Sequence, residues 1–361
     1  MRPIIDTHLD LSWNAIQWDR DLTRPLAEMN AAEAEMTDHR ARGRATVSLP
    51  EMRRGNVAVC LATVLSRAKP ASRRATGFTR RDLDFPDQTI ASAVGAAQVE
   101  YYRLLAQRGE ITLISTAPAF REHVRRWVES PGGPIGVVIA MEGADPIVNP
   151  QQAQAWWDRG LRCVGLAHYG PHPYAFGTGS AGPVTPAGRE LLKEFERLGM
   201  IVDLTHCAEP GFFETLECFS GRVLASHNMC RAIAPGDRQF SDDQLRALIE
   251  RDAIIGMAFD SWMLVPNYKA GQMPRDATTL ADVANHVQHI ADLAGNVRNI
   301  AIGTDLDGGY GTEQTPLELV TIADVQRLAD VLKSRGFSDA DCDAIFYGNS
   351  LRFFTEALPP S

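Results

Sequence analysis

Eight short apolar runs recur along the chain, and stretches with helical patterns lie between most of them. The runs are continuous rather than alternating, which is typical of strands buried on both faces of a parallel sheet. Repeated alternation of strand and helix predicts such a sheet, and eight units close it into a (β/α)8 barrel of the TIM type. The runs cover residues 4–10, 56–64, 135–142, 161–168, 200–206, 222–227, 253–259 and 299–305.

Helix signals support this alternation. A helix is predicted from about Gln88 to Gln107, and a second one begins where Thr185 can cap the helix and Pro186 fits its first turn, ending at Gly199. Residues 241–244 have the sequence of a capping box, which opens a third helix. A fourth helical pattern runs from about residue 279 to residue 293.

A long polar segment separates the first two apolar runs, from about residue 14 to residue 55. It contains scattered helix formers and few strand signals, so we expect an insertion in the barrel. A helical segment is expected at the C-terminal end. Because no internal repeat or second core is visible, residues 1–361 are predicted to form a single barrel domain.

Composition excludes several classes of partner. The net charge is −9 and no basic run marks a nucleic-acid surface, since the densest basic stretch, Arg73 to Arg81, has the pattern of a solvated loop. No apolar run approaches the ~20 residues of a membrane span, and no signal peptide precedes the first run. The six cysteines are sparse and form no CxxC pair, which predicts reduced thiols and a cytoplasmic location.

Residues that can bind metals stand at or just beyond the C-terminal ends of six of the eight runs. In barrels of this type those ends form the functional face, whereas core histidines and loop carboxylates would scatter along the runs. That alternative fits one or two of the positions, but hardly all six. The residues are His8 with Asp10, Glu142, His168, His206, His227 and Asp305.

This set is too large for one tetrahedral zinc site with an open position. It suits two metal ions about 3.5–4 Å apart that share a bridging carboxylate and a hydroxide, which is a nucleophile at neutral pH. Glu142 is placed for the bridge, because no lysine that could serve as a carbamylated bridge lies in the first four runs. Asp305 is the candidate base, and His168 is the candidate for stabilising a developing oxyanion.

With their neighbours, these residues resemble the membrane (renal) dipeptidase family, metallopeptidases of the amidohydrolase superfamily. The resemblance extends over nearly the whole chain. The matching stretches are Asp6–Asp10, Met141–Gly143, Leu166–His168, Asp203–His206, Ala225–Asn228, Ile302–Gly308 and Gly348–Phe354.

The resemblance implies a metal-dependent hydrolase barrel that binds two zinc ions, although other divalent metals are possible. By this resemblance, His8 and Asp10 would bind one zinc ion, and His206 and His227 would bind the other. Glu142 would bridge the two ions.

The same resemblance implies a dipeptidase in which His168 lies near the scissile carbonyl and Asp305 transfers the proton. Arg238 stands where the family binds the C-terminal carboxylate of the substrate, a role that suits its forked guanidinium, although by position alone it would be a surface arginine. The family accepts a D-residue at the C-terminal position, and its members are often homodimers.

Two departures from the family pattern concern substrate fit. Residues 144–146 replace an expected glycine and polar residue, and the segment after the seventh run, residues 259–263, lacks an expected tyrosine. Asp260 in that segment could favour a basic or amino group. His172 shows no partner pattern, and Asp307 is a candidate for supporting the metal ligands.

Two alternative functions remain open. One is an N-acyl-amino-acid amidohydrolase or lactonase that uses the same binuclear site. The other, which is less favoured, is a barrel that binds a ligand without catalysis; it predicts missing metal ligands, and none is missing here.

Overall fold

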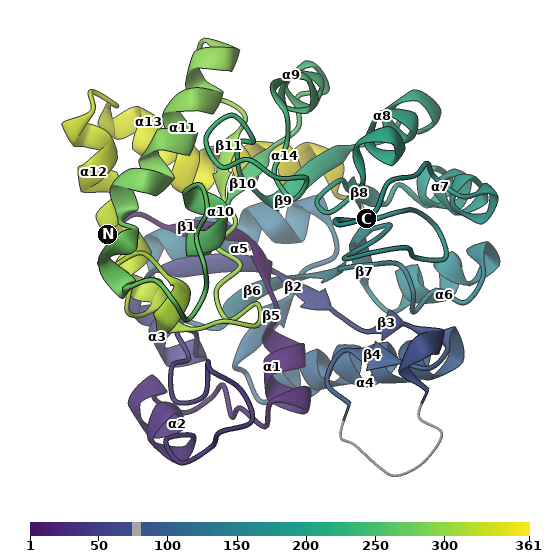
Figure 1. The fold of residues 1–361 in the computed structure, drawn as a ribbon, viewed down its shortest axis with the longest axis horizontal. Coiled ribbons are helices and arrows are strands. Elements are labelled where there is room, and N and C mark those ends of the chain that lie inside the picture. The colour runs from purple at the N-terminus through teal and green to yellow at the C-terminus, as the bar shows by residue number, and fades with distance from the viewer. Residues whose placement is uncertain (74–80) are drawn as a thin grey trace.

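Eight parallel strands close into a barrel in the computed structural model, which describes residues 1–73 and 81–361 (Figure 1). Strand β2 pairs with β1 on one side and with β6 on the other, and this last pairing closes the ring. Each predicted apolar run contains one barrel strand, so the predicted (β/α)8 barrel is confirmed. The strands are β1 (Ile4–Leu9), β2 (Val57–Val64), β6 (Ile135–Met141), β7 (Leu161–Gly165), β8 (Ile201–Asp203), β9 (Val223–Asn228), β10 (Ile255–Met257) and β11 (Ile300–Ile302).

Among the described residues, three short strands lie outside the barrel. Strand β5 (Ile111–Leu113) pairs with β6, and its sequence gave no signal because only three residues take part and Thr112 is exposed. Strands β3 (Arg67–Ala68) and β4 (Asp84–Phe85) form a separate parallel pair. Most of the loop predicted between Arg73 and Arg81 lies outside the described residues.

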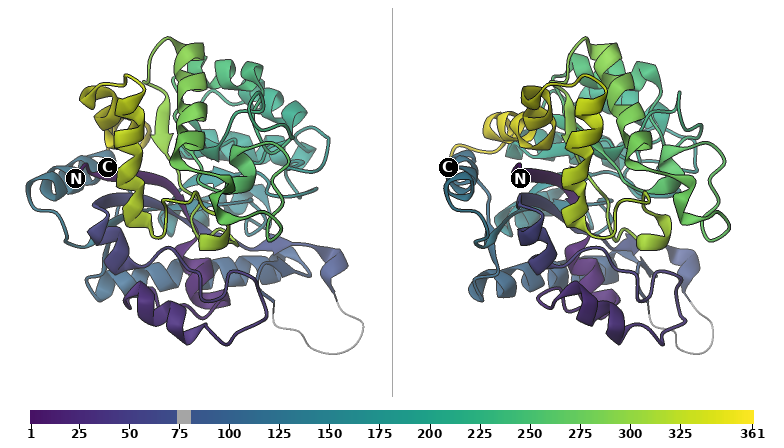
Figure 2. Two further views of the ribbon diagram at one scale, coloured as in Figure 1. Left: turned by 60° about the vertical axis from the view of Figure 1, so that its left-hand side comes forward. Right: turned by 90° about the vertical axis from the view of Figure 1, so that its left-hand side faces the viewer.

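Helices connect the strands and surround the barrel (Figures 1 and 2). In residues 1–73 and 81–361, none of them has both the length and the apolar character that crossing a bilayer requires. They are α1 (Leu11–Gln17), α2 (Leu26–Ala32), α3 (Leu49–Arg54), α4 (Gln88–Gln107), α5 (Ala117–Glu129), α6 (Ala153–Asp158), α7 (Pro186–Leu198), α8 (Glu209–Cys218), α9 (Asp242–Glu250), α10 (Ser261–Leu264), α11 (Leu280–Ala294), α12 (Leu328–Ser334), α13 (Asp339–Asp343) and α14 (Asn349–Ala357), with short 3-10 and π turns between some of them.

The predicted helix boundaries follow from their caps. Thr185 accepts a hydrogen bond from the N–H of Gly188 at the start of α7, and Gly199 ends that helix in the left-handed conformation with φ 73°. Ser241 and Gln244 form the predicted capping box of α9. These local signals predicted the boundaries because each cap is completed within four residues of sequence.

The segment between the first two barrel strands contains α1, α2, α3 and long loops, drawn purple in the lower part of both views in Figure 2. Asp307 connects this segment to the barrel. Its carboxylate accepts hydrogen bonds from the main-chain N–H groups of Thr46 at 2.8 Å and Val47 at 3.1 Å. Buried Arg20 adds an ion pair to Asp307 at 3.6 Å and another to Glu33 at 2.9 Å. Asp307 therefore holds this segment in place, and the prediction that it supports the metal ligands is wrong.

The C-terminal segment forms α12, α13 and α14, as the helical pattern predicts. Its last helix packs on the outside of the barrel, where Phe354 of α14 meets Phe120 of α5 with ring centroids 5.4 Å apart. Both rings are fully buried, which ties the end of the chain to the helix that precedes β6.

Candidate active site

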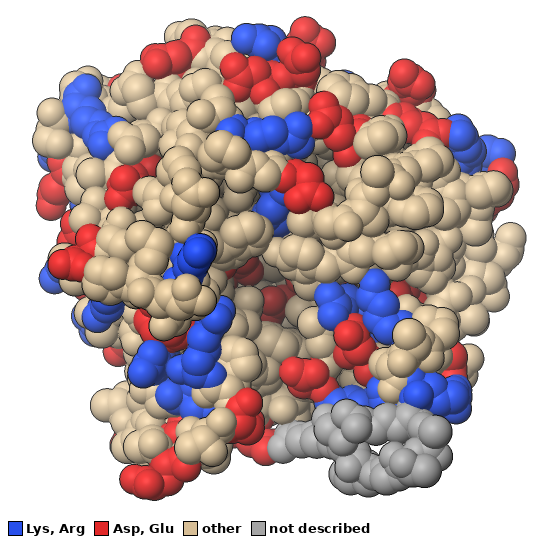
Figure 3. Space-filling model, in the orientation of Figure 1, with Lys and Arg blue, Asp and Glu red and all other residues tan. Residues whose placement is uncertain are grey.

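A pocket of about 280 Å³ opens at the C-terminal ends of the barrel strands. Figure 3 shows a hollow near the middle of one face, with acidic atoms in its depth and basic side chains on either side. The pocket lining includes the predicted site residues Asp10, Glu142, His168, His206, His227, Arg238 and Asp305. His8 does not line the pocket, but its ring nitrogen reaches the same carboxylate as the other histidines.

Glu142 lies at the centre of the site. Its Oε1 atom is 3.2 Å from Nε2 of His206, 3.4 Å from Nε2 of His227, 3.7 Å from Nε2 of His8 and 3.8 Å from Nε2 of His168. Its carboxylate belongs to two groups of ligand atoms that could each hold a metal ion, one with His8 and His227 and one with His168 and His206. The carboxylate predicted as the bridge is thus the residue that these groups share.

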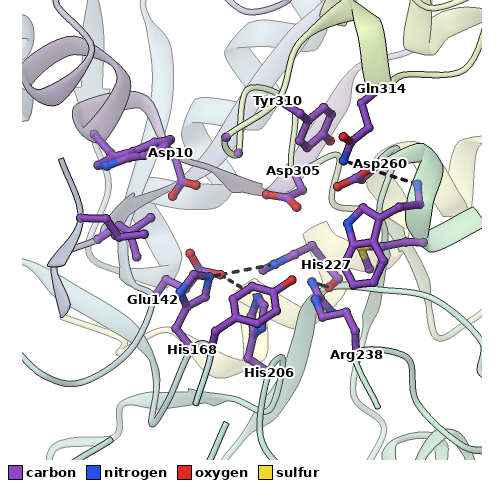
Figure 4. A pocket seen from close by; sticks show the side chains of 18 of the residues that line it. Asp10, Glu142, His168, His206, His227, Arg238, Asp260, Asp305, Tyr310 and Gln314 are labelled. Atoms are coloured by element: carbon purple, nitrogen blue, oxygen red, sulfur yellow. Dashed lines mark hydrogen bonds and ion pairs between the residues drawn. The ribbon is translucent and has the colours of Figure 1, made fainter. Parts of the chain in front are cut away.

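Two further carboxylates face this cluster. Asp10 and Asp305 lie across the pocket from the imidazoles (Figure 4). The Nε2 atom of His8 is 3.8 Å from an oxygen of each, and the three residues form another group that could hold an ion. This Nε2 atom is fully buried and has no hydrogen-bond partner among the described residues. A buried ring nitrogen without a partner fits a metal ligand.

Hydroxyl groups orient the histidines. Ser226 Oγ lies 3.2 Å from Nδ1 of His8 and 2.9 Å from Nδ1 of His227, while Thr178 Oγ1 lies 3.0 Å from Nδ1 of His206. With Nδ1 engaged in this way, Nε2 of each ring is the atom directed at Glu142. Hydrogen bonds of this kind fix ring orientation in metal sites.

Two buried aspartates hold the strand ends in place. Asp6 Oδ1 accepts the N–H of Thr304 at 3.0 Å and so ties β1 to the end of β11. Asp203 Oδ1 accepts the N–H groups of Thr205 and Ser226, each at 3.0 Å, and so ties β8 to β9. The residues that carry the site are therefore fixed to one another across neighbouring strands.

The backbone is strained at two site positions. His206 and Asp305 have φ angles of 65° and 57°, in the left-handed region that residues other than glycine rarely adopt. Both follow strand ends, where the left-handed turn redirects the side chain. Beside Asp305, the chain passes so close to its neighbours that a Cβ at Gly303 would lie 1.9 Å from the carbonyl oxygen of Ser226.

The electrostatics of the site favour a bound cation. Burial raises the pKa of Asp10, Glu142 and Asp305. The charge of the neighbouring carboxylates raises the pKa of Glu142 and Asp305 further. In the described part of the chain none of these three forms an ion pair with a lysine or arginine. Burial also lowers the pKa of His8 to about 3, so its imidazole is neutral, the form that binds metals. Nitrogen and carboxylate donors of this kind suit zinc and similar divalent ions.

Arg238 is 2% exposed and lines the same pocket. Its Nη1 donates to Asn228 Oδ1 at 3.0 Å and its Nη2 donates to the carbonyl oxygen of His227 at 3.1 Å. No carboxylate among the described residues forms an ion pair with it. A buried cation with unused donors is suited to bind an anionic group of a ligand.

His168 is held by both its main chain and its side chain. Its N–H donates to Nε2 of His172 at 3.0 Å, and Nδ1 of His172 lies 2.6 Å from Asp145 Oδ2. The sequence showed no partner pattern for His172 because its partner, Asp145, follows the end of a different strand. Arg67 Nη1 donates to Nδ1 of His168 at 3.0 Å.

Sequence reasoning missed several residues of the pocket. Arg67, which follows β2, was not predicted, and Asp260, which follows β10, was predicted only as a residue that could favour a basic or amino group. These two barrel strands carry no predicted metal ligand or catalytic residue, so position after a strand was the available signal. Asp260 accepts a hydrogen bond from Gln314 at 2.7 Å, and burial raises its pKa to about 7. Tyr310 lines the pocket near Asp260 and Asp305 (Figure 4), but it comes from the loop after β11 rather than from the segment where a tyrosine was expected.

Comparison with known proteins identifies the family of the chain. Residues 1–358 match the family model for membrane dipeptidases, peptidase family M19. The dipeptidase aclJ of Aspergillus oryzae is 30% identical over 225 residues, which cover 61% of this chain and 51% of the relative. An uncharacterized dipeptidase of Schizosaccharomyces pombe is 29% identical over 223 residues, which cover 60% of this chain and 52% of that protein. The match thus spans about half the length of these curated relatives.

Solved structures share the fold. The dipeptidase AC, a metallopeptidase of family M19, superimposes with a TM-score of 0.77 at 20% identity and covers 100% of this chain and 99% of its own. A metallopeptidase from Rhodobacter sphaeroides, liganded with a phosphinate mimic of the dipeptide L-Ala-D-Ala, gives a TM-score of 0.77 at 21% identity and 99% coverage of both chains. With the match of the family model over nearly its whole length, the chain belongs to the membrane dipeptidase family of metallopeptidases, peptidase family M19.

Proposed function

We propose that the chain is a zinc-dependent dipeptidase that binds two zinc ions and hydrolyses dipeptides, including those with a C-terminal D-residue. The observation that carries the proposal is the approach of four imidazole Nε2 atoms to within 3.8 Å of Glu142 Oε1. Family membership supports the reaction class, and the ligand named for the Rhodobacter relative supports the stereochemistry.

Five residues would hold the two ions. His8 and Asp10 would bind the first ion, His206 and His227 the second, and Glu142 both. When bound, the ions supply a hydroxide nucleophile at neutral pH and polarise the scissile carbonyl. The protein keeps the three imidazoles neutral and oriented before a substrate arrives, because burial lowers the pKa of each ring and Ser226 and Thr178 fix their orientation.

Three more residues act on the substrate. Arg238 binds the C-terminal carboxylate of the substrate. Because Arg238 is buried in the pocket beside the metal ligands, this contact selects short substrates, whose C-terminal carboxylate lies close to the scissile bond. His168 donates a hydrogen bond to the oxygen of the scissile carbonyl as negative charge develops there. Asp305, whose pKa is raised by burial, accepts a proton and returns it to the leaving amine.

The experiment is a metal analysis combined with a substrate panel. Protein purified without chelators is expected to contain close to two zinc ions per chain and to cleave L,L- and L,D-dipeptides. N-acyl amino acids and lactones form the comparison set, and cleavage of these without cleavage of any dipeptide would contradict the proposal. Less than one zinc ion per chain and no turnover would indicate a barrel that only binds a ligand.

We also propose a cytoplasmic location and a homodimer. The six cysteines are free thiols in the structure, which suits a reducing compartment. The homodimer and the single-domain organisation are expectations from the family and the sequence. Light scattering on the purified protein and microscopy of a fluorescent fusion measure these properties directly.

A further inference from the structure

The side chain of Arg67 joins the loop after β2 to the site histidine that is predicted not to bind a metal ion. Its Nη1 donates to Nδ1 of His168 at 3.0 Å, and its Nε donates to Asp84 Oδ1 at 2.7 Å. A guanidinium group has five N–H donors and no acceptor. Nδ1 of His168 must therefore accept this hydrogen bond, so it carries no proton.

The proton of His168 is thereby assigned to its other nitrogen. A neutral imidazole has one N–H, and an imidazolium would present N–H groups at both nitrogens, which Arg67 could not accommodate. We propose that Arg67 is a positioning residue that holds His168 in the Nε2–H tautomer, so that this ring donates a hydrogen bond into the pocket instead of binding a metal ion.

The other three site histidines show the contrast. Nδ1 of His8 and Nδ1 of His227 face Ser226, and Nδ1 of His206 faces Thr178. A hydroxyl oxygen can accept a hydrogen bond, so these rings can carry the proton on Nδ1 and leave the Nε2 lone pair free for a metal ion. Nε2 of His168 also lies within reach of Glu142. In the tautomer that Arg67 imposes, however, this nitrogen carries the proton and has no lone pair for a metal ion.

The arrangement around Arg67 is rigid enough for this role. Its side chain is 13% exposed and is anchored by Asp84 on the paired strand β4. The main chain of His168 is fixed separately by His172 and Asp145. Loss of the guanidinium would therefore free the ring of His168 without releasing its backbone.

The tautomer can be observed directly in the zinc-loaded protein labelled with ¹⁵N-histidine. Long-range ¹H–¹⁵N correlation spectra distinguish protonated from unprotonated ring nitrogens, and His168 is identified by the signals that disappear in His168→Gln. We expect a protonated Nε2 and an unprotonated Nδ1, and we expect this pattern to be lost in Arg67→Met. A protonated Nδ1 in the wild-type protein would overturn the proposal.

Kinetics test the consequence of the tautomer, which rests on the proposed dipeptidase function. We expect Arg67→Met to lower kcat by on the order of 10–100-fold, the range for removing a group that orients a site histidine, with KM and zinc content nearly unchanged. Arg67→Lys should recover part of the loss because an ammonium also has only donors. Arg81→Met is the matched control, since Arg81 bonds Ser72 and the main chain of Asp84 and does not contact His168.

A raised KM at unchanged kcat in Arg67→Met, with the tautomer retained, would show that Arg67 binds substrate instead and would overturn the proposal. If Arg67→Met does not fold, the wild-type spectrum and Arg67→Lys still decide the question. Absence of dipeptide hydrolysis in the wild-type protein would refute the proposed function, while the spectrum would still test the tautomer.

Discussion

Replacing Arg238 by methionine should abolish discrimination between a dipeptide and its C-terminal amide. Two of the five guanidinium N–H donors are already used, by Asn228 and by the carbonyl oxygen of His227. Three donors remain, enough for a two-point contact with a carboxylate. Arg238 forms no ion pair with a carboxylate among the described residues, so these donors are available to a substrate carboxylate.

The size of the effect follows from these contacts. A hydrogen bond to a charged group contributes about 1.5–3 kcal/mol, so at the lower value for each bond the two-point contact is worth about 3 kcal/mol, or roughly 150-fold in kcat/KM. Wild-type protein should therefore prefer L-Ala-L-Ala over its amide by about this factor. Methionine has a similar length and flexibility, so Arg238→Met fills much of the space without the charge.

The comparison of two substrates separates binding from distortion. Removing Arg238 leaves Asn228 Oδ1 without its donor, and any resulting disturbance of the pocket would slow both substrates alike. The ratio of kcat/KM values, measured from the released amine by liquid chromatography and mass spectrometry, isolates the carboxylate contact. Arg231→Met is the control, because Arg231 binds Glu209 and should leave the ratio unchanged. A ratio unaltered in Arg238→Met, or equal losses on both substrates, would refute the reasoning.

Three further predictions concern the proton, the metal ions and pH. Asp305→Asn should lower kcat by at least about 100-fold with zinc content retained, and equal activity would remove Asp305 from proton transfer. Dialysis against a chelator should lower the melting temperature, and added zinc should restore it; an unchanged melting curve would contradict a metal site that joins the C-terminal ends of the barrel strands. Asp260→Asn should stabilise the metal-free protein by up to about 4 kcal/mol at neutral pH, because burial raises the pKa of Asp260 to about 7 and ionising this buried carboxyl disfavours the folded state. The gain should appear as pH rises from about 4 to 7 and be absent near pH 3, which urea unfolding at several pH values measures.

The barrel, and the convergence of the candidate metal ligands at one end of it, could be predicted because both follow from local pattern and simple topology. Parallel strands bring their C-terminal ends to one edge whatever the exact register, so His206 and His227 meet although helix α8 separates their strands in sequence. The caps at Thr185 and Ser241 are likewise local. None of these predictions requires knowledge of a distant contact.

The groups that orient the ligands could not be predicted in the same way. Arg67 and His168 are 101 residues apart, and Ser226 reaches His8 over 218 residues. Such contacts depend on how loops of different lengths fold over the mouth of the barrel. Asp307 illustrates the limit, since its position after β11 suggested the site while its side chain binds the main chain of Thr46.

The chemistry of the site and the stability of the fold are in opposition. Asp10, Glu142 and Asp305 are brought together without a lysine or arginine partner in the described part of the chain, and His206 and Asp305 occupy strained backbone positions. In metal-free protein these features are unfavourable and are offset by ties between strand ends, such as that from Asp6 to Thr304. The excess of negative charge that destabilises the metal-free barrel is also what attracts divalent cations, so metal affinity and fold stability are coupled through the same carboxylates.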